Sequence, residues 1–230
     1  CINDTIIHLA TSAMPFGGVG ESGMGGYHGV EGFKTFSHTR SIVDKKTWMD
    51  LPMRYQPYGK KADRLILPGV GAFADAAAKL RADGLDSFVR EQAASGKPLL
   101  GICLGMQLLF EKSYEFGEHQ GLGLIPGEIV PMQGTIPADL KIPQIGWNRL
   151  RLKGESPLFQ HIQDGDYVYF VHSYYASGCD TYVIATTDYG IEMTAAAAHG
   201  NVYGCQFHPE KSGPVGLKIL AAFCGTEAVQ

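Results

Sequence analysis

The segment GICLG, residues 101–105, has the residue types and spacing of a catalytic nucleophile. Cys103 stands between two glycines, after an apolar stretch typical of a strand and before a stretch typical of a helix. This is the cysteine version of the G-x-S-x-G nucleophile elbow, whose glycines allow the close backbone approach of a tight turn. The N–H groups and dipole of the following helix favour a thiolate. We predict that Cys103 is a nucleophile; the alternative is a buried structural cysteine.

A second segment, QFHPE at residues 206–210, supplies a base and a group to orient it. In an extended chain, residues i and i+2 point the same way, so the Glu210 carboxylate can lie beside the His208 ring. Glu210 would hold the ring tautomer while His208 exchanges protons with Cys103 and the leaving group. Taken alone, His-Pro-Glu is more often an ordinary loop. Together with the elbow, it predicts a Cys-His-Glu triad, with His172 as a wall of the site.

Acyl chemistry at Cys103 also requires donors for an oxyanion. The Leu104 N–H follows the nucleophile and supplies one donor by elbow geometry. The segment PGVG, residues 68–71, ends an apolar strand and is the predicted second source. Parallel strands bring their carboxyl ends to one edge of a sheet, where open α/β proteins bind ligands. The alternative for PGVG is an ordinary turn.

The elements that must position these residues alternate along the chain. Strand, helix, strand and helix are predicted in turn, and the region after them is rich in short strands and ends in an amphipathic helix. This order indicates an α/β fold with a parallel sheet. The predicted ranges are a strand at 64–69, a helical stretch at 73–97, a strand at 98–103, a helix at 104–113, the strand-rich region from 121 onward and a closing helix at 213–224.

Composition excludes several classes of function. The 230 residues are 45% hydrophobic, and Lys+Arg 19 against Asp+Glu 23 gives a net charge of −4. Without a basic excess, we expect no nucleic-acid partner. The opening CINDTIIHLA has neither the flank of a signal peptide nor the length of a membrane span, so we expect no membrane association. The five cysteines lack CxxC spacing, so we expect no metal, no cofactor and a cytoplasmic location.

Glycine is concentrated in residues 15–29, which we interpret as an irregular, glycine-shaped loop. Residues 18–23 match G-x-G-x-x-G, the dinucleotide-binding pattern. No apolar strand leads into this match and no helix follows it, so the phosphate-binding interpretation is the weaker alternative.

Five motifs in order carry a resemblance to a known family. LILPGVGAF, GICLGMQLLFEKS, PQIGWN, YFVHSYY and CQFHPEKSG resemble class I glutamine amidotransferases over about residues 61–224. PQIGWN and HSYY make the glutaminase subunits of imidazole glycerol phosphate synthase the nearest resemblance. The family implies a flavodoxin-like α/β fold with a parallel or mixed sheet flanked by helices. It also implies glutamine hydrolysis through a thioester. The released ammonia passes to a (β/α)8 cyclase subunit that makes imidazole glycerol phosphate and aminoimidazole carboxamide ribotide in histidine biosynthesis.

The resemblance assigns roles to residues of this chain. The triad is Cys103, His208 and Glu210, and the oxyanion donors are Val70 and Leu104. Glutamine would be bound by Gly69, Gly71, Gln107, Glu115, Ser173 and Tyr174. The cyclase partner would be met by Trp147, Asn148, Tyr169 and Lys211.

Residues 1–59 do not fit this family and resemble the C-terminal tail of class-3-type aldehyde dehydrogenases, whose catalytic groups have no counterpart here. We expect an aldehyde-dehydrogenase-tail-like segment and linker at 1–59, and an amidotransferase domain at 60–230 that lacks the family's N-terminal strand–helix–strand. Its first strand should then have an unpaired edge that exposes Leu65, Ile66 and Leu67. The alternatives are a weakly active or inactive mosaic that retains a partner-binding surface, and an amidotransferase of another synthase.

Overall fold

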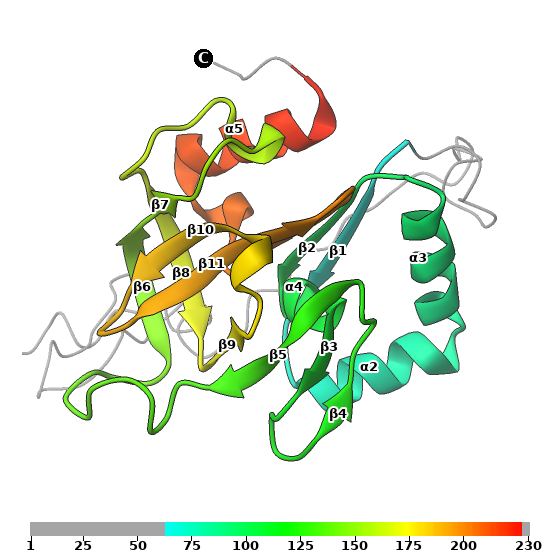
Figure 1. Ribbon diagram of the computed structural model, residues 1–230, viewed down its shortest axis with the longest axis horizontal. Coiled ribbons are helices and arrows are strands. Elements are labelled where there is room, and N and C mark those ends of the chain that lie inside the picture. Colours follow the sequence, from blue (N-terminus) through cyan, green and yellow to red (C-terminus); the bar gives the residue numbers. More distant parts are fainter. Residues whose placement is uncertain (1–62, 227–230) are drawn as a thin grey trace, which may run out of the picture. The chain divides into compact units, whose positions relative to one another are not determined.

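The computed structural model describes residues 63–226, in which a six-stranded mixed sheet is the largest of three sheets (Figure 1). The spatial order is β1-β2-β12-β11-β10-β7. The pairings β1–β2 and β2–β12 are parallel, and the pairings β12–β11, β11–β10 and β10–β7 are antiparallel. The strand bounds are β1 Leu65–Gly69, β2 Leu99–Cys103, β12 Val202–Cys205, β11 Glu192–His199, β10 Val183–Asp188 and β7 Arg151–Leu152. The predicted α/β class with a parallel or mixed sheet is confirmed.

The helical stretch predicted at 73–97 forms two helices, α2 (Phe73–Ala82) and α3 (Leu85–Ala94). Between them Gly84 has a φ of 66°, a left-handed conformation that ends the first helix. In Figure 1 both helices lie beside the β1–β2 end of the sheet. The closing helix α5 (Gly213–Cys224) is confirmed where it was predicted.

The prediction of one helix over 104–113 is wrong in its second half. Helix α4 spans Leu104–Leu109, and strand β3 (Phe110–Ser113) follows directly. Strand β3 pairs with β4 (His119–Gln120) and β5 (Ile125–Pro131), so its ladder bonds replace those of the next helical turn. The step from the buried, apolar Phe110 to the exposed, charged Glu111 was the signal that the two-residue period of a strand replaces the helical period here.

Two smaller sheets complete the strand-rich region. One has the order β4-β3-β5-β9, with β9 at Tyr174–Ser177. The other, called the β6–β8 ribbon below, pairs β6 (Gln144–Arg149) with β8 (Tyr167–His172). The apolar run over 167–176 is thus divided at Ser173 between two sheets. Short 3₁₀ helices lie at Pro157–Phe159, Asp180–Tyr182 and Pro209–Lys211.

Strand β2 is buried at every position and separates two hydrophobic clusters. Leu100 and Ile102 belong to a cluster that contains Ile219 of α5. Leu99 belongs to a second cluster, which contains Val89 of α3. Because alternate side chains of a strand point to opposite faces, β2 is the shared centre of both clusters. Its carboxyl end, which carries Cys103, is therefore buried in the core.

Strand β1 is the end strand of the large sheet within the described residues and pairs there with β2 alone. Ile66 is 46% exposed, whereas Leu65 and Leu67 are half-buried against other apolar side chains. The predicted exposure therefore holds for Ile66 and only partly for its neighbours. Residues 1–59, with the predicted glycine-rich loop and the G-x-G-x-x-G match at 18–23, lie outside the described residues. No helix among residues 63–226 is long and apolar enough to cross a membrane.

Candidate active site

The nucleophile elbow has the backbone geometry that its glycines predict. Cys103 has a φ of 54° and a ψ of −112°, an unusual conformation for a residue with a side chain. A Cβ on Gly105 would lie 1.7 Å from the Leu67 carbonyl oxygen, and one on Gly101 would lie 2.7 Å from the Gly105 oxygen. Backbone thus fills the space where these side chains would be. A strained residue held by its surroundings is typical of a functional site.

Burial gives the Cys103 thiol a different ionisation from the one the sequence suggested. Desolvation raises the pKa of Cys103 to about 11, and the Leu104 N–H offsets only part of this effect. The nearby Glu210 carboxylate also raises this pKa, while the Lys211 ammonium lowers it. The expectation that the elbow alone favours a thiolate is therefore wrong for the resting protein. A base must remove the proton when Cys103 reacts.

His208 and Glu210 form the ion-pair geometry that the HPE motif predicts. The His208 Nδ1 lies 2.7 Å from the Glu210 Oε1. His208 is 3% exposed, whereas the Glu210 side chain is 48% exposed. A carboxylate accepts a hydrogen bond, so Nδ1 carries the hydrogen and Nε2 is free to act as a base.

Sheet register brings the nucleophile and the base to the same edge. Cys205 pairs with Ile102 across the parallel β12–β2 ladder, so the next residues, Gln206 and Cys103, are neighbours. The Gln206 Nε2 lies 3.9 Å from the Cys103 sulfur. His208 follows two residues later, beyond the end of its strand. The residues of the predicted triad therefore lie at or just beyond the carboxyl ends of two adjacent parallel strands.

The backbone of the His208 loop is bonded to strand β8. The His208 N–H donates to the Tyr169 carbonyl at 2.9 Å. The buried Ser212 hydroxyl donates to the His208 carbonyl at 2.6 Å and accepts from the Tyr169 N–H at 3.0 Å. Sequence reasoning missed Ser212 as a positioning residue. Its place at the end of the HPEKS motif was the available signal.

Gln107 is held in a buried network beside the elbow. Its Nε2 donates to the Gln206 Oε1 at 3.0 Å and to the Tyr174 carbonyl at 3.3 Å. Both amide hydrogens are thereby used, and the amide oxygen is left to accept from another group. Gln206, which connects this network to Cys103, was also missed, although it lies inside the CQFHPE motif.

The end of strand β1 lies beside the elbow. Gly69 pairs with Cys103 in the β1–β2 register, and a Cβ on Gly69 would lie 3.1 Å from the Gly105 nitrogen and from the Leu104 Cβ. Val70 follows and is 82% exposed, and Gly71 has a φ of 109°. Within PGVG, Pro68 and Gly69 therefore end strand β1 beside the elbow, and the exposed Val70 and Gly71 follow at the place predicted for an oxyanion donor.

Glu115 and Tyr174 lie close together at the start of α2. One Glu115 carboxylate oxygen accepts a 2.6 Å hydrogen bond from the Phe73 N–H, the first residue of that helix. Burial first, and the Glu115 charge second, raise the pKa of Tyr174. Ser173 lies between β8 and β9, and its carbonyl accepts from the Met132 N–H. The predicted glutamine-binding residues thus come from four separate stretches of the chain: 69–71, 107, 115 and 173–174.

The β6–β8 ribbon presents the predicted partner-facing residues unequally. Trp147 is 52% exposed and pairs with Tyr169, with ring centroids 6.0 Å apart. The Lys211 ammonium lies 5.9 Å from the Tyr169 ring centroid. Asn148 is on the other face of the ribbon, where it donates to the Asp188 carbonyl and accepts from Gln144. Only three of these four residues therefore share the exposed face.

His172, predicted as a wall of the site, is buried on the inner face of the ribbon. Burial, and to a smaller extent the charge of His208, lower the pKa of His172 to about 4, although the hydrogen bond to the Tyr174 carbonyl opposes this shift. The ring is therefore neutral at physiological pH.

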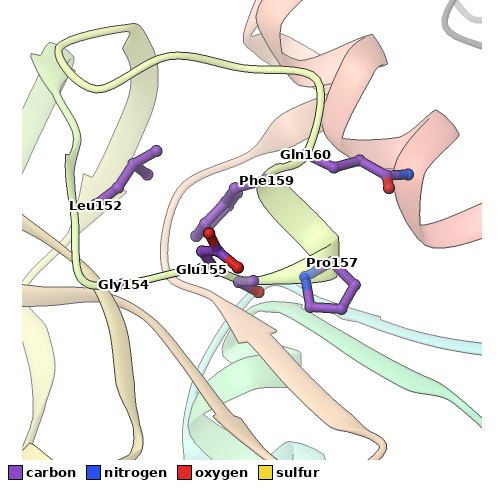
Figure 2. Close-up of a pocket in the computed structure, with 7 residues that line it drawn as sticks. Leu152, Gly154, Glu155, Pro157, Phe159 and Gln160 are labelled. Carbon is purple, nitrogen blue, oxygen red and sulfur yellow. The ribbon is translucent and has the colours of Figure 1, made fainter.

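A cavity of about 570 Å³ lies away from the triad, next to the 3₁₀ helix at Pro157–Phe159 (Figure 2). Its walls include Leu152, Glu155 and Phe159, and none of the triad residues. Among residues 63–226, no group of three His, Cys, Asp or Glu side chains is arranged to hold a metal ion. The predicted catalytic residues therefore lie at the elbow and not in this cavity.

Comparison with known proteins identifies the family. The family model for class-I glutamine amidotransferases matches residues 38–225. The chain belongs to the class-I glutamine amidotransferase family. It is accordingly an amidotransferase enzyme subunit. The match begins upstream of the boundary predicted at residue 60, which stays a prediction.

Similar curated proteins are imidazole glycerol phosphate synthase subunits. The subunit HisH of Lactococcus lactis is 53% identical over 165 residues, which are 71% of this chain and 80% of that protein. The subunit HisH of Wolinella succinogenes is 56% identical over 70% of this chain and 80% of that protein. A solved structure of PurLQS from Thermotoga maritima matches with a TM-score of 0.56 and 20% identity, over 72% of this chain and 80% of that one. That likeness supports the fold.

Proposed function

We propose that this chain is the glutaminase subunit of an imidazole glycerol phosphate synthase. The observation that carries the proposal is the strained, buried Cys103 at one edge of the sheet with the hydrogen-bonded His208–Glu210 pair. Relatives with that printed name are 50–56% identical to this chain. The motifs PQIGWN and HSYY favour this synthase over another one that also takes ammonia from an amidotransferase.

The reaction begins when Cys103 attacks the side-chain amide of glutamine. Because the thiol is neutral at rest, His208 Nε2 accepts its proton as the C–S bond forms. Glu210 holds the ring in the required tautomer and stabilises its positive charge. The Leu104 N–H and the PGVG backbone at Val70 donate to the oxyanion. His208 then returns the proton to the leaving nitrogen, which departs as ammonia.

Water completes the cycle. His208 takes a proton from the water that attacks the thioester, and glutamate leaves as the Cys103 thiol reforms. The balance is glutamine plus water to glutamate plus ammonia. Gln107 offers its amide oxygen to the substrate, and Glu115, Gly69, Gly71, Ser173 and Tyr174 form the rest of its site. Ammonia then passes to a (β/α)8 cyclase subunit that meets Trp147, Tyr169 and Lys211, with Asn148 behind them.

The test is glutamate release by the full chain, alone and with the cyclase subunit and its nucleotide ligand. We expect very slow hydrolysis alone and faster hydrolysis in the complex, because His208 is bonded to β8, whose Tyr169 lies on the exposed face. The Cys103→Ala variant serves as the blank. No glutamate above this blank in either condition would refute the proposal, and equal rates would refute coupling.

A second candidate is a weakly active or inactive mosaic that keeps the partner-binding face. It is favoured by the 46% exposure of Ile66 on the end strand β1, next to the strand that carries Cys103. In this candidate residues 1–59, resembling an aldehyde dehydrogenase tail, stand in place of the family's first strand–helix–strand. Cyclase binding without glutamate release would distinguish it from the first candidate.

A further inference from the structure

Phe116 is held in a backbone conformation that residues with large side chains avoid. Among residues 63–226, Cys103 and Phe116 are the only residues other than glycine with a positive φ, and both have a φ of 54°. Phe116 lies in the turn between β3 and β4, where glycine, asparagine or aspartate would adopt this φ at little cost. A bulky residue in this conformation is strained, and such strain is concentrated at functional sites. One of the two strained residues is the predicted nucleophile, so we looked for a function of the other.

Burial of the Phe116 ring does not offset this strain. The side chain is 88% exposed, more than any other large hydrophobic side chain in residues 63–226. The ring makes an edge contact with the Tyr174 ring, with centroids 6.4 Å apart and planes inclined by 67°. Because most of its surface meets solvent, the Phe116 ring has room for a ligand beside it.

Sheet topology places Phe116 beside residues proposed to bind glutamine. Strand β3 runs parallel to β5, whereas β9 runs antiparallel to it on the other side, so the end of β3 and the start of β9 lie at the same end of this sheet. Glu115 follows β3 and accepts from the Phe73 N–H at 2.6 Å, and Tyr174 begins β9. The Tyr174 carbonyl accepts from Gln107, which belongs to the network that reaches Cys103. Phe116 is therefore at the rim of that site.

A carboxylate beside two aromatic rings favours a cationic ligand. An ammonium group is attracted to the negative face of an aromatic ring, and a carboxylate accepts several hydrogen bonds, of which the Phe73 N–H uses one at Glu115. Glutamine carries one cationic group, its α-ammonium. Since the side-chain amide of glutamine reacts at Cys103, its amino-acid end lies away from the elbow, toward the rim. The α-carboxylate of glutamine would be repelled by Glu115, so the α-ammonium is the group that fits.

We propose that Phe116 is a further substrate-binding residue, whose ring, together with Tyr174 and the Glu115 carboxylate, binds the α-ammonium group of glutamine. The proposal rests on the proposed glutaminase function for its substrate. It explains why a phenylalanine stands where asparagine or glycine would be more stable, because strain at a binding residue is kept when it serves the ligand. Removal of the ring should therefore weaken substrate binding and stabilise the fold at the same time.

The test compares glutamine with 4-carbamoylbutanoate, which is glutamine without its α-amino group. Each is titrated by calorimetry into the Cys103→Ala chain in complex with the cyclase subunit and its nucleotide ligand, so that no glutamine is hydrolysed. Phe116→Asn on this background should raise the Kd of glutamine about tenfold, as expected for one lost cation–π contact, and leave the Kd of 4-carbamoylbutanoate unchanged. Phe116→Tyr keeps the ring and should retain the parental Kd. Leu217→Ala, at an exposed apolar residue of α5, is the control and should also retain it.

Thermal denaturation of the same chains without ligand separates a binding role from a structural one. Asparagine adopts a positive φ readily, so Phe116→Asn should melt about 2–4 °C above the Cys103→Ala parent. A lower melting temperature, an equal loss of affinity for both ligands or an unchanged Kd of glutamine would overturn this proposal alone. Absence of glutamine binding to the Cys103→Ala parent would overturn it together with the glutaminase function, so the two failures are distinguishable.

Discussion

The two segments that supply the catalytic pair are held in different ways. The nucleophile segment, residues 99–109, is buried throughout and is locked by contacts between backbones. The base segment, residues 202–212, leaves its strand before His208 and is held by hydrogen bonds to Tyr169 and Ser212. Close packing tolerates almost no change, whereas a hydrogen-bonded loop can adjust. The nucleophile is thus a fixed point, and the base is the adjustable partner.

The largest effect should come from removing the chemistry itself. Cys103→Ala should lower glutamine turnover in the cyclase complex by at least about 10⁴-fold, and His208→Ala nearly as much. The loss of turnover in Glu210→Ala should be about 100-fold smaller than in Cys103→Ala, because the Glu210 carboxylate only orients the base. Steady-state glutamate release measures the series. A Glu210→Ala loss equal to that of Cys103→Ala would mean that the base segment is as fixed as the nucleophile segment.

Crowding the nucleophile segment should unfold it. Gly105→Ala places a Cβ 1.7 Å from the Leu67 carbonyl oxygen, so we expect destabilisation by more than about 3 kcal/mol. The comparison is Gly204→Ala, whose Cβ would lie 2.6 Å from the Met106 Cγ; we expect a smaller loss there, because a side chain can shift more readily than a backbone carbonyl. Thermal denaturation followed by circular dichroism compares the two. Similar melting temperatures for both variants would contradict the packing argument.

The buried thiol predicts a steep pH dependence of alkylation. With a pKa of about 11, the thiolate fraction of Cys103 rises tenfold per pH unit below that value. Iodoacetamide should therefore modify Cys103 about 100-fold faster at pH 9 than at pH 7. Peptide mapping measures the rate, with the exposed Cys224 as a reference for reagent and digestion. A Cys103 rate that does not change above pH 7 would mean that the elbow stabilises the thiolate after all.

A diazo-ketone analogue of glutamine should label Cys103 selectively. Because it binds in the substrate site, it should modify Cys103 ahead of the other cysteines even at neutral pH. Mass spectrometry of the digest locates the label. Labelling mainly at Cys205 or Cys179 would contradict the assignment of the nucleophile.

Loosening the base segment should have a smaller effect. Ser212→Ala removes two hydrogen bonds at a buried position, so we expect about 1–3 kcal/mol of destabilisation. Turnover should fall about tenfold while Cys103 alkylation is unchanged, because the elbow does not depend on Ser212. Ser95→Ala, which removes an exposed hydroxyl bonded to the Gln92 carbonyl, is the control. A faster alkylation of Cys103 in Ser212→Ala would show that the two segments are coupled.

The smallest effect is expected at the exposed edge of the sheet, on strand β1. Ile66→Lys should change stability by less than about 0.5 kcal/mol, because the side chain is already 46% exposed. Aggregation on heating should decrease, since a lysine discourages pairing of a free edge. Light scattering during a thermal ramp measures it. Increased aggregation would indicate that Ile66 is covered in solution.

Spacing in the sequence determined the chemistry. The glycines around Cys103 indicated an elbow, because only glycine fits where Gly105 meets the Leu67 carbonyl. The HPE pattern indicated the hydrogen bond between His208 and Glu210, because i and i+2 share a side of an extended chain. Both are local arguments. The strand–helix alternation likewise indicated an α/β sheet, although the period changed unseen at Phe110.

Only the tertiary structure decided the properties of residues whose neighbours come from distant segments of the chain. The pKa of Cys103 is raised because a hydrophobic cluster built from distant segments buries the end of β2, which no local pattern reveals. Ser212 became a positioning residue because β8 lies beside its loop. Gln144 and His172 are adjacent because β6 pairs with β8 across 28 residues of sequence separation. Residue types set what each group can do, and long-range packing sets the solvation and the partners that decide whether it does so.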